Sequence, residues 1–160
     1  MERVLIVDWD VHHGNGTQDI FYEDPTVFFF SSHQSPLYPG TGSRRETGRG
    51  LGEGTTMNRP LPAGTGGTEL RAIFEEELAP AVAQFAPEFV FISAGFDSRK
   101  DDPLGQFELE DEDFAELTRI VRRMADSTAN SRIVSVLEGG YNLHGLGLAA
   151  AAHVSALLES

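Results

Sequence analysis

The sequence predicts an α/β protein: a parallel β-sheet flanked by helices. Apolar runs without alternation lie at residues 3–8, 26–31, 89–94 and 132–137, a pattern typical of strands buried on both faces of a parallel sheet. Segments with helical spacing of apolar residues separate most of these runs. Such alternation favours parallel strands joined by right-handed crossovers.

The segments between the predicted strands are expected to be helices or loops. A short helix is predicted at 17–23, and longer helices at 68–85, 111–125 and 146–158. Pro80 should kink or split the second of these helices, because proline lacks the backbone donor that a helix interior needs. Residues 33–67 are rich in glycine and proline and include the basic pair Arg44 and Arg45. We expect this stretch to be one long functional loop.

Composition limits the class of protein. With 160 residues, 40% of them hydrophobic, the chain is expected to form a single domain, residues 1–160. No apolar segment approaches the ~20 residues of a membrane span, and no signal peptide is recognised, so a cytoplasmic location without membrane attachment is expected. The formal charge of −13 argues against direct nucleic-acid binding and is compatible with a cationic substrate.

The most informative stretch follows the first predicted strand. Asp8, Asp10, His12 and His13 crowd into six positions directly behind Val4-Leu5-Ile6-Val7. In extended backbone, alternate residues point the same way, so Asp10 and His12 can converge on one ion. The chain has no cysteine, and a mixed set of carboxylate and imidazole ligands suits zinc or another divalent transition metal. Taken alone, a strand followed by Asp-x-Asp is also found at the start of phosphatases of the haloacid-dehalogenase type, so that interpretation stays open at this point.

Two other predicted strands also end in polar residues. Gly95-Phe96-Asp97 follows the run at 89–94, and Glu138-Gly139-Gly140-Tyr141 follows the run at 132–137. The carboxyl ends of parallel strands lie at one edge of a sheet, which is where ligands bind in open α/β folds. We therefore expect Asp97 and Tyr141 to meet Asp10 and His12 at one active site.

The ordered motifs resemble the histone deacetylase family and its bacterial acetylpolyamine and acetoin-utilisation relatives, of the class II-like or bacterial type. The matching segments run in the family's order along almost the whole chain. They are Asp8-Trp9-Asp10-Val11-His12-His13-Gly14-Asn15-Gly16-Thr17-Gln18, Tyr38-Pro39-Gly40-Thr41-Gly42, Gly50-Leu51-Gly52-Glu53-Gly54, Ser93-Ala94-Gly95-Phe96-Asp97, Asp102-Pro103-Leu104-Gly105 and Glu138-Gly139-Gly140-Tyr141-Asn142. The phosphatase alternative has no comparable set. The resemblance implies a partial arginase/deacetylase-like fold.

The resemblance also implies a zinc-dependent deacetylase that hydrolyses the amide bond of acetyl-lysine or an acetylpolyamine. Asp10, His12 and Asp97 would be the zinc ligands, and Tyr141 would donate its hydroxyl to the substrate oxygen as negative charge develops there. The walls of the substrate tunnel would come from Tyr38, Leu104, Gly139 and Gly140.

Two monovalent cation sites, suited to K⁺, follow from the same resemblance. The first would use Asp8 and Ser31, with the backbone carbonyls of Asp10 and His12. The second would use the carbonyls of Phe21, Asp24 and Val27.

One part of the family's machinery has no counterpart in these residues. The family's general base belongs to a tandem histidine motif upstream of the zinc segment, and His12-His13 matches the zinc segment instead. We expect the chain to represent the C-terminal portion of the catalytic domain. Asp8 and Asn15 match residues that would orient the two absent imidazoles.

Two functional interpretations stay open at this stage. The chain could be a deacetylase portion that needs a complementing N-terminal portion, or self-association, for activity. Alternatively, it could be a non-catalytic remnant that binds metal or another protein.

Overall fold

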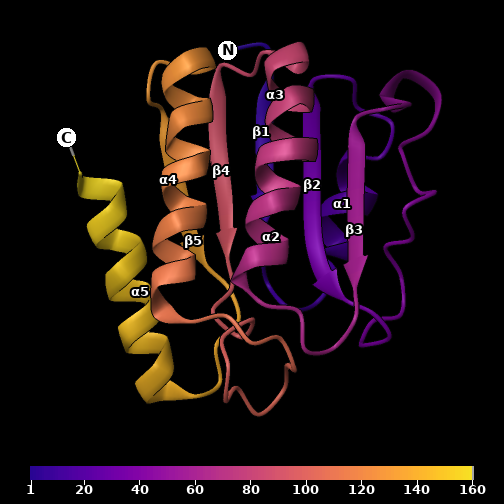
Figure 1. Ribbon diagram of the computed structural model, residues 1–160. Helices are drawn as coiled ribbons and strands as arrows, with labels where there is room; N and C mark the ends of the chain where they lie inside the picture. Colours follow the sequence, from indigo (N-terminus) through magenta and orange to yellow (C-terminus); the bar gives the residue numbers. More distant parts are fainter. Residues whose placement is uncertain (160) are drawn as a thin grey trace.

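The computed structural model describes residues 1–159 as a five-stranded parallel sheet in the order β3-β2-β1-β4-β5 (Figure 1). Its register sets Asp8 opposite both Ser31 and Ser93. The predicted α/β class is confirmed, and all strands end at the same edge. Their bounds are β1 Val4–Asp8, β2 Val27–Gln34, β3 Thr56–Leu61, β4 Phe89–Ala94 and β5 Ile133–Leu137.

Helices lie on both faces of the sheet, and those on the front face form the larger layer. Figure 1 shows α2, α3 and α4 in front, α1 behind, and α5 beside α4 at the β5 end. Their bounds are α1 Asn15–Phe21, α2 Gly67–Ile73, α3 Ala79–Phe85, α4 Asp111–Thr128 and α5 Leu143–Leu158.

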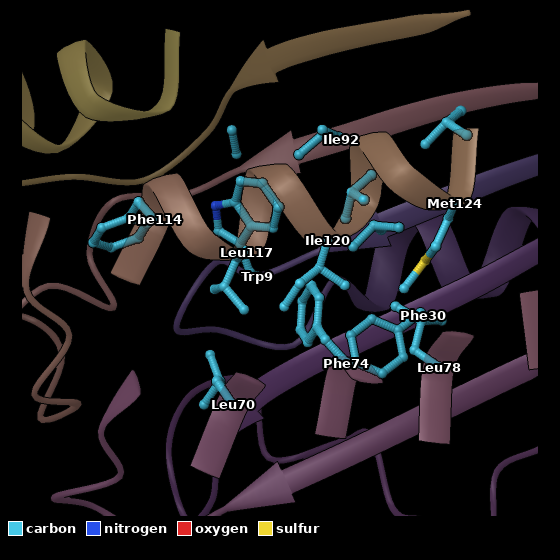
Figure 2. Packing of buried hydrophobic residues seen from close by; sticks show 14 of the residues in the cluster. Trp9, Phe30, Leu70, Phe74, Leu78, Ile92, Phe114, Leu117, Ile120 and Met124 are labelled. Atoms are coloured by element: carbon cyan, nitrogen blue, oxygen red, sulfur yellow. The ribbon is translucent and has the colours of Figure 1, made fainter. Parts of the chain in front are cut away.

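The main hydrophobic core fills the space between the sheet and the front helices. Trp9 and Phe74 have ring centroids 6.3 Å apart, and Phe30 meets Phe74 edge to face at 5.1 Å (Figure 2). Leu78 and Leu117 are fully buried in the same cluster. Burying each such side chain contributes roughly 1.5–3 kcal/mol. This core fixes the strands whose ends carry the polar residues.

The prediction of one long loop over residues 33–67 is wrong in part. The second strand runs on to Gln34, and β3 pairs with it in parallel from Thr56 to Leu61. The sequence of β3, Thr-Met-Asn-Arg-Pro-Leu, contains Pro60, which obscures its strand character. Proline is tolerated here because β3 is an edge strand, where one row of backbone groups has no partner in the sheet.

The helix predicted at 68–85 is divided, as Pro80 suggested. A π-helical turn, Phe74–Leu78, separates α2 from α3, and Pro80 lies in the first turn of α3. The backbone stays helical through Leu78 and Ala79, and Ala79 N donates to Phe74 O, so the wider π-helical turn directly before Pro80 accommodates the amide donor that proline lacks. The last helix begins three residues earlier than predicted, because the side chain of Asn142 accepts a hydrogen bond from Gly145 N at 3.1 Å and caps it.

The β5 edge is the least covered part of the sheet. Val134, Val136 and Leu137 are 42%, 49% and 61% exposed, and Phe91 of the neighbouring β4 is also exposed. Parallel sheets normally have both faces covered, so this region departs from the usual pattern. Within residues 1–159, no helix is both long and apolar enough to cross a bilayer.

Candidate metal centre

Three side chains of metal-ligand type converge at the carboxyl edge of the sheet, and we call these three residues the metal cluster. Asp10 and His12 follow β1, and Asp97 follows the adjacent β4. One ligand atom from each residue lies within 4.8 Å of the other two. Nδ1 of His12 is 2.9 Å from Oδ1 of Asp10 and 3.2 Å from Oδ2 of Asp97. The structure therefore brings the three predicted zinc ligands together.

Backbone N–H groups hold both carboxylates in place. Val11 N donates to Oδ1 of Asp97 at 2.9 Å, and His12 N donates to Oδ1 of Asp10 at 2.8 Å. Gly139 N, just after β5, donates to Oδ2 of Asp10 at 2.8 Å. Three strand exits thus contribute to one cluster, and its geometry depends on the register of the sheet.

Two glycines permit this close approach. A Cβ at Gly139 would lie 2.0 Å from Oδ2 of Asp97 and 2.5 Å from Oδ2 of Asp10. A Cβ at Gly95 would lie 2.4 Å from Cα of Asp10. Neither position can carry a side chain without displacing Asp10 or Asp97.

The cluster has excess negative charge that His12 offsets. Burial raises the pKa of Asp97, and the nearby Asp10 carboxylate adds to the rise. Burial would also raise the pKa of Asp10, but the hydrogen bonds from His12 lower it. Hydrogen bonds to Asp10 and Asp97 raise the pKa of His12 to about 10. The site therefore favours a positive charge between the two carboxylates.

These residues fit a divalent transition metal. Oδ2 of Asp97 is buried, and apart from its contact with Nδ1 of His12 at 3.2 Å, itself a candidate ligand atom, it has no hydrogen-bond donor among the described residues. Two carboxylates and one imidazole form a mixed oxygen and nitrogen donor set, which zinc accepts. A cation among the three ligand atoms would satisfy the Asp97 oxygen.

A cavity of about 770 Å³ opens beside the cluster. The residues predicted for the substrate tunnel line it, with the exception of Gly140. Tyr38 and Leu104 lie at its exposed side, 78% and 51% accessible to solvent. The lining residues are Asp10, His12, Leu37, Tyr38, Leu104, Leu137, Glu138, Gly139 and Tyr141.

Tyr141 shares this cavity with the metal cluster. Its ring lies edge-on to that of His12, with centroids 6.5 Å apart. Burial raises the pKa of Tyr141, and the Asp97 and Asp10 carboxylates add to the rise, so its hydroxyl remains protonated at neutral pH. A protonated phenol at this position can act as a hydrogen-bond donor to a ligand in the cavity.

Asp102 orients the cavity wall, a role that the sequence analysis missed. Its Oδ2 accepts from Tyr141 N at 2.8 Å and from Asn142 N at 3.2 Å, and its Oδ1 accepts from Leu104 N at 2.9 Å. One buried carboxylate thus joins the Leu104 loop to the Tyr141 segment. The Asp-Pro turn that begins at Asp102 was the available signal, since aspartate side chains commonly accept from backbone amides two residues ahead.

For the two predicted monovalent cation sites, the structure shows where the predicted residues lie and which groups they contact. Asp8 is buried, its Oδ1 accepts from Asp10 N at 3.0 Å, and burial raises its pKa, with the charge of Asp10 adding to the rise. Ser31 lies opposite Asp8, and its Oγ is 3.0 Å from Nδ1 of His33. For the second site, Phe21 is the last residue of α1, Val27 is the first residue of β2, and Asp24 lies in the turn between them.

The other four histidines lie outside the set of candidate metal ligands. His13 is buried and contacts Thr41 Oγ1 at 2.7 Å and Gln18 Oε1 at 3.0 Å. Nε2 of His33 lies 3.1 Å from the carbonyl oxygen of Gly42, and burial lowers the pKa of His33 to about 4. His144 is exposed on α5, and His153 is buried between α5, α4 and β5.

Asp8 and Asn15 border a small hollow next to the metal cluster. Its volume is about 230 Å³, and its lining also includes Asp10, His12 and Glu138. Asn15 is the exposed first residue of α1. The two residues predicted to orient absent imidazoles therefore face one space beside the ligands.

Comparison with known proteins identifies the family. The profile of the histone deacetylase domain matches residues 1–157. This chain belongs to the histone deacetylase family. Histone deacetylase 14, chloroplastic, of Arabidopsis thaliana is 44% identical over 158 residues, which cover 99% of this chain and 37% of that protein. A probable deacetylase of Archaeoglobus fulgidus is 49% identical over 144 residues, covering 90% of this chain and 40% of that protein.

A solved structure agrees with the sequence comparison. The crystal structure of the HDA15 HD domain, 38% identical to this chain, superposes with a TM-score of 0.92. The match covers 98% of this chain and 45% of that one. The chain thus spans less than half the length of the histone deacetylase relatives that it matches, and the predicted arginase/deacetylase-like fold is confirmed.

Proposed function

We propose that the chain carries the metal-binding and oxyanion-stabilising part of a zinc-dependent deacetylase site. The substrate would be an acetylated amine, either acetyl-lysine or an acetylpolyamine. The observation that carries this proposal is the convergence of Asp10, His12 and Asp97 on the wall of the cavity that contains Tyr141.

Each residue has a distinct task in amide hydrolysis. Asp10, His12 and Asp97 would hold the ion, since their ligand atoms already surround one point. When bound, Zn²⁺ supplies positive charge that polarises the amide carbonyl and lowers the pKa of a water molecule. The Tyr141 hydroxyl, protonated at neutral pH, would donate to the carbonyl oxygen as negative charge develops there.

The cavity suits the aliphatic arm of such a substrate. Tyr38 and Leu104 present apolar surface at its exposed side, and Leu37 also lines the cavity. The formal charge of −13 favours the approach of cationic amines. These features support acetyl-lysine and acetylpolyamines equally.

We propose that an imidazole general base comes from outside these residues. His12 belongs to the ligand set, the described contacts of His13, His33 and His153 occupy those rings within the fold, and His144 is exposed on α5 and lines neither the cavity nor the hollow. General acid–base assistance is typically worth 10²–10⁴-fold in rate. We propose that a second polypeptide segment, whether a complementing N-terminal portion or another copy, places a base in the hollow beside Asp8 and Asn15.

A second candidate function is a metal-binding or protein-interaction module without turnover. The exposed apolar residues of β5 favour it, because an open strand edge is a template for pairing. The two candidates share the metal site and differ in hydrolysis once a base is supplied.

Metal content tests the shared part of the proposal. The purified chain, saturated with zinc and desalted, is expected to retain one zinc ion per chain by atomic emission. Asp97→Ala should lose it, whereas Asp19→Ala, an exposed aspartate on α1, should retain it. A chain that retains no zinc would overturn the proposal.

Hydrolysis of an acetyl-lysine peptide then separates the two candidates. The chain alone should show little turnover, and addition of a histone deacetylase N-terminal segment with tandem histidines should raise it. Tyr141→Phe should abolish that gain, and Tyr22→Phe, outside the cavity, should preserve it. Strong hydrolysis by the chain alone would refute the need for an external base, and no gain on complementation would favour the non-catalytic module.

A further inference from the structure

A second cavity, of about 610 Å³, lies at the amino-terminal edge of the sheet. Its lining includes Arg3 just before β1, Pro25 just before β2 and Thr56 at the start of β3. Because all strands are parallel, this edge is opposite the one that carries the metal cluster (Figure 1). The volume is within the ~300–1,000 Å³ typical of small-molecule sites.

The lining of this cavity carries positive charge, although the protein as a whole is negatively charged. The chain has 25 acidic and 12 basic residues, yet Arg3, Arg44 and Arg59 all line this space. Within the described part of the chain, neither aspartate nor glutamate is among the lining residues. A cluster of guanidinium groups in an otherwise acidic protein indicates a site for an anion.

Nearby carboxylates compensate only part of this positive charge. Oε2 of Glu77 is 2.6 Å from Nη2 of Arg59 and 3.6 Å from Nη1 of Arg44, so one carboxylate serves two guanidinium groups. Nε of Arg3 donates to the neutral carbonyl of Ala86 at 2.9 Å. Glu88, which is near Arg3, lies 3.9 Å from the ammonium group of Met1. Glu77 offsets one of the three guanidinium charges, and the Met1 ammonium group offsets Glu88, so two positive charges remain for a ligand.

The rest of the lining combines the polar residues Thr47, Thr56 and Gln84 with an apolar, partly aromatic surface. The rings of Phe28 and Phe85 lie 5.4 Å apart, and Met57 and Ala81 complete this surface. A ligand that uses the whole cavity needs a flat or apolar body next to a group with about two negative charges. Phosphate monoesters meet the charge requirement near neutral pH, and guanidinium groups bind phosphate oxygens in a paired geometry.

We propose that this cavity binds an organic phosphate, namely a phosphate monoester on an aromatic or other apolar group. Arg3 and Arg44 bind the phosphate, and the body of the ligand rests on the partly exposed Phe85, which packs against the buried Phe28. Arg44 belongs to the long segment between β2 and β3, whereas Phe85 ends α3. Ligand binding therefore ties that segment to α3. This site is independent of the proposed hydrolase activity.

Calorimetric titration of the full chain at low ionic strength tests the proposal, with adenosine 5′-monophosphate as the probe. The expected Kd is about 1 mM or tighter. Adenosine, which lacks the charge, and inorganic phosphate, which lacks the ring, should each bind about tenfold more weakly. Arg44→Gln and Arg3→Gln should each weaken binding of the probe about tenfold, as expected for loss of one charged hydrogen-bond donor.

Arg45→Gln provides the matched control. Arg45 is the exposed neighbour of Arg44 and does not line the cavity, so its removal should leave the affinity unchanged. Both Arg3 and Arg44 are exposed, and their variants should keep the circular dichroism spectrum of the parent chain. The proposal is overturned if millimolar nucleotide does not bind, if adenosine binds equally well, or if Arg44→Gln and Arg45→Gln weaken binding equally.

Discussion

The backbone of Gly139 and the carboxylate of Asp10 are joined by a 2.8 Å hydrogen bond, although 129 residues separate them. This bond connects the exit of β5 to the exit of β1, with β4 and Asp97 between them in the sheet. The metal cluster therefore depends on three strands keeping their register. Its shape is a property of the sheet more than of any single loop.

Replacing Gly139 by alanine should reduce zinc affinity at least tenfold. The new Cβ would lie 2.0 Å from Oδ2 of Asp97, so that carboxylate must move out of the cluster. Competition with a chromogenic zinc chelator measures the change. Gly147→Ala is the control, because nothing lies within 4 Å of a Cβ built there, and its zinc affinity should equal that of the parent chain.

Replacing Asp102 by alanine should loosen the cavity wall while leaving zinc bound. Three backbone amides, those of Leu104, Tyr141 and Asn142, lose their common acceptor. Hydrogen bonds to a charged group contribute about 1.5–3 kcal/mol each, so exchange of these amides should accelerate at least tenfold in NMR hydrogen-exchange experiments. Asp101→Asn, at the exposed neighbouring position, should leave all three rates unchanged; slow exchange in Asp102→Ala would contradict the positioning role.

His153 should make the fold sensitive to mild acid. Burial lowers the pKa of its imidazole to about 4 from 6.5, so between pH 6.5 and 4 the unfolded chain binds a proton that the folded chain excludes. The stability that comes from keeping His153 neutral is complete above pH 6.5, and it is lost as pH decreases toward 4. The loss from this residue is about 3 kcal/mol.

Urea denaturation at pH 7.5 and pH 5 measures this effect. His153→Gln lacks the titrating group and keeps polar atoms near Thr118 and Ser135, the present partners at 2.6 and 2.9 Å. The variant should be less stable than the parent at pH 7.5 and lose less stability on acidification. An equal loss in both proteins would show that His153 does not cause the pH dependence.

Replacing Leu78 by alanine should lower the free energy of unfolding by about 2–5 kcal/mol. Leu78, in the π-helical turn between α2 and α3, is fully buried in the core (Figure 2), and its removal leaves a cavity there. Leu51, 82% exposed, is the matched position, and Leu51→Ala should change stability by less than about 0.5 kcal/mol. Chemical denaturation of both variants distinguishes the two cases.

The sequence predicted the central strands because their side chains repeat one simple pattern. β4 was predicted with its observed bounds, and β1 and β2 were displaced only at their ends. By contrast, β3 carries Asn58, Arg59 and Pro60, and only its position at the sheet edge explains why a strand forms there. That position depends on pairing with β2, which local sequence does not encode.

The same distinction applies to the candidate site. Asp10, His12 and Asp97 follow apolar runs, so their convergence could be predicted from strand order and parallel pairing. Asp102 was missed as a positioning residue because the Asp-Pro turn signals only its local bond to Leu104 N, whereas Tyr141 N and Asn142 N lie about 40 residues further along the chain. The burial of His153 against α4 and β5 depends on how α5 packs, which the local sequence does not show.

The bare β5 edge has a consequence for how the protein is handled. An open strand edge with aliphatic side chains can pair with a strand of another molecule, and a higher protein concentration favours such pairing. Val134, Val136 and Leu137 offer such an edge without a lysine or proline to block it. Dilution and cold storage therefore suit the isolated chain, and concentrated stocks should turn turbid first.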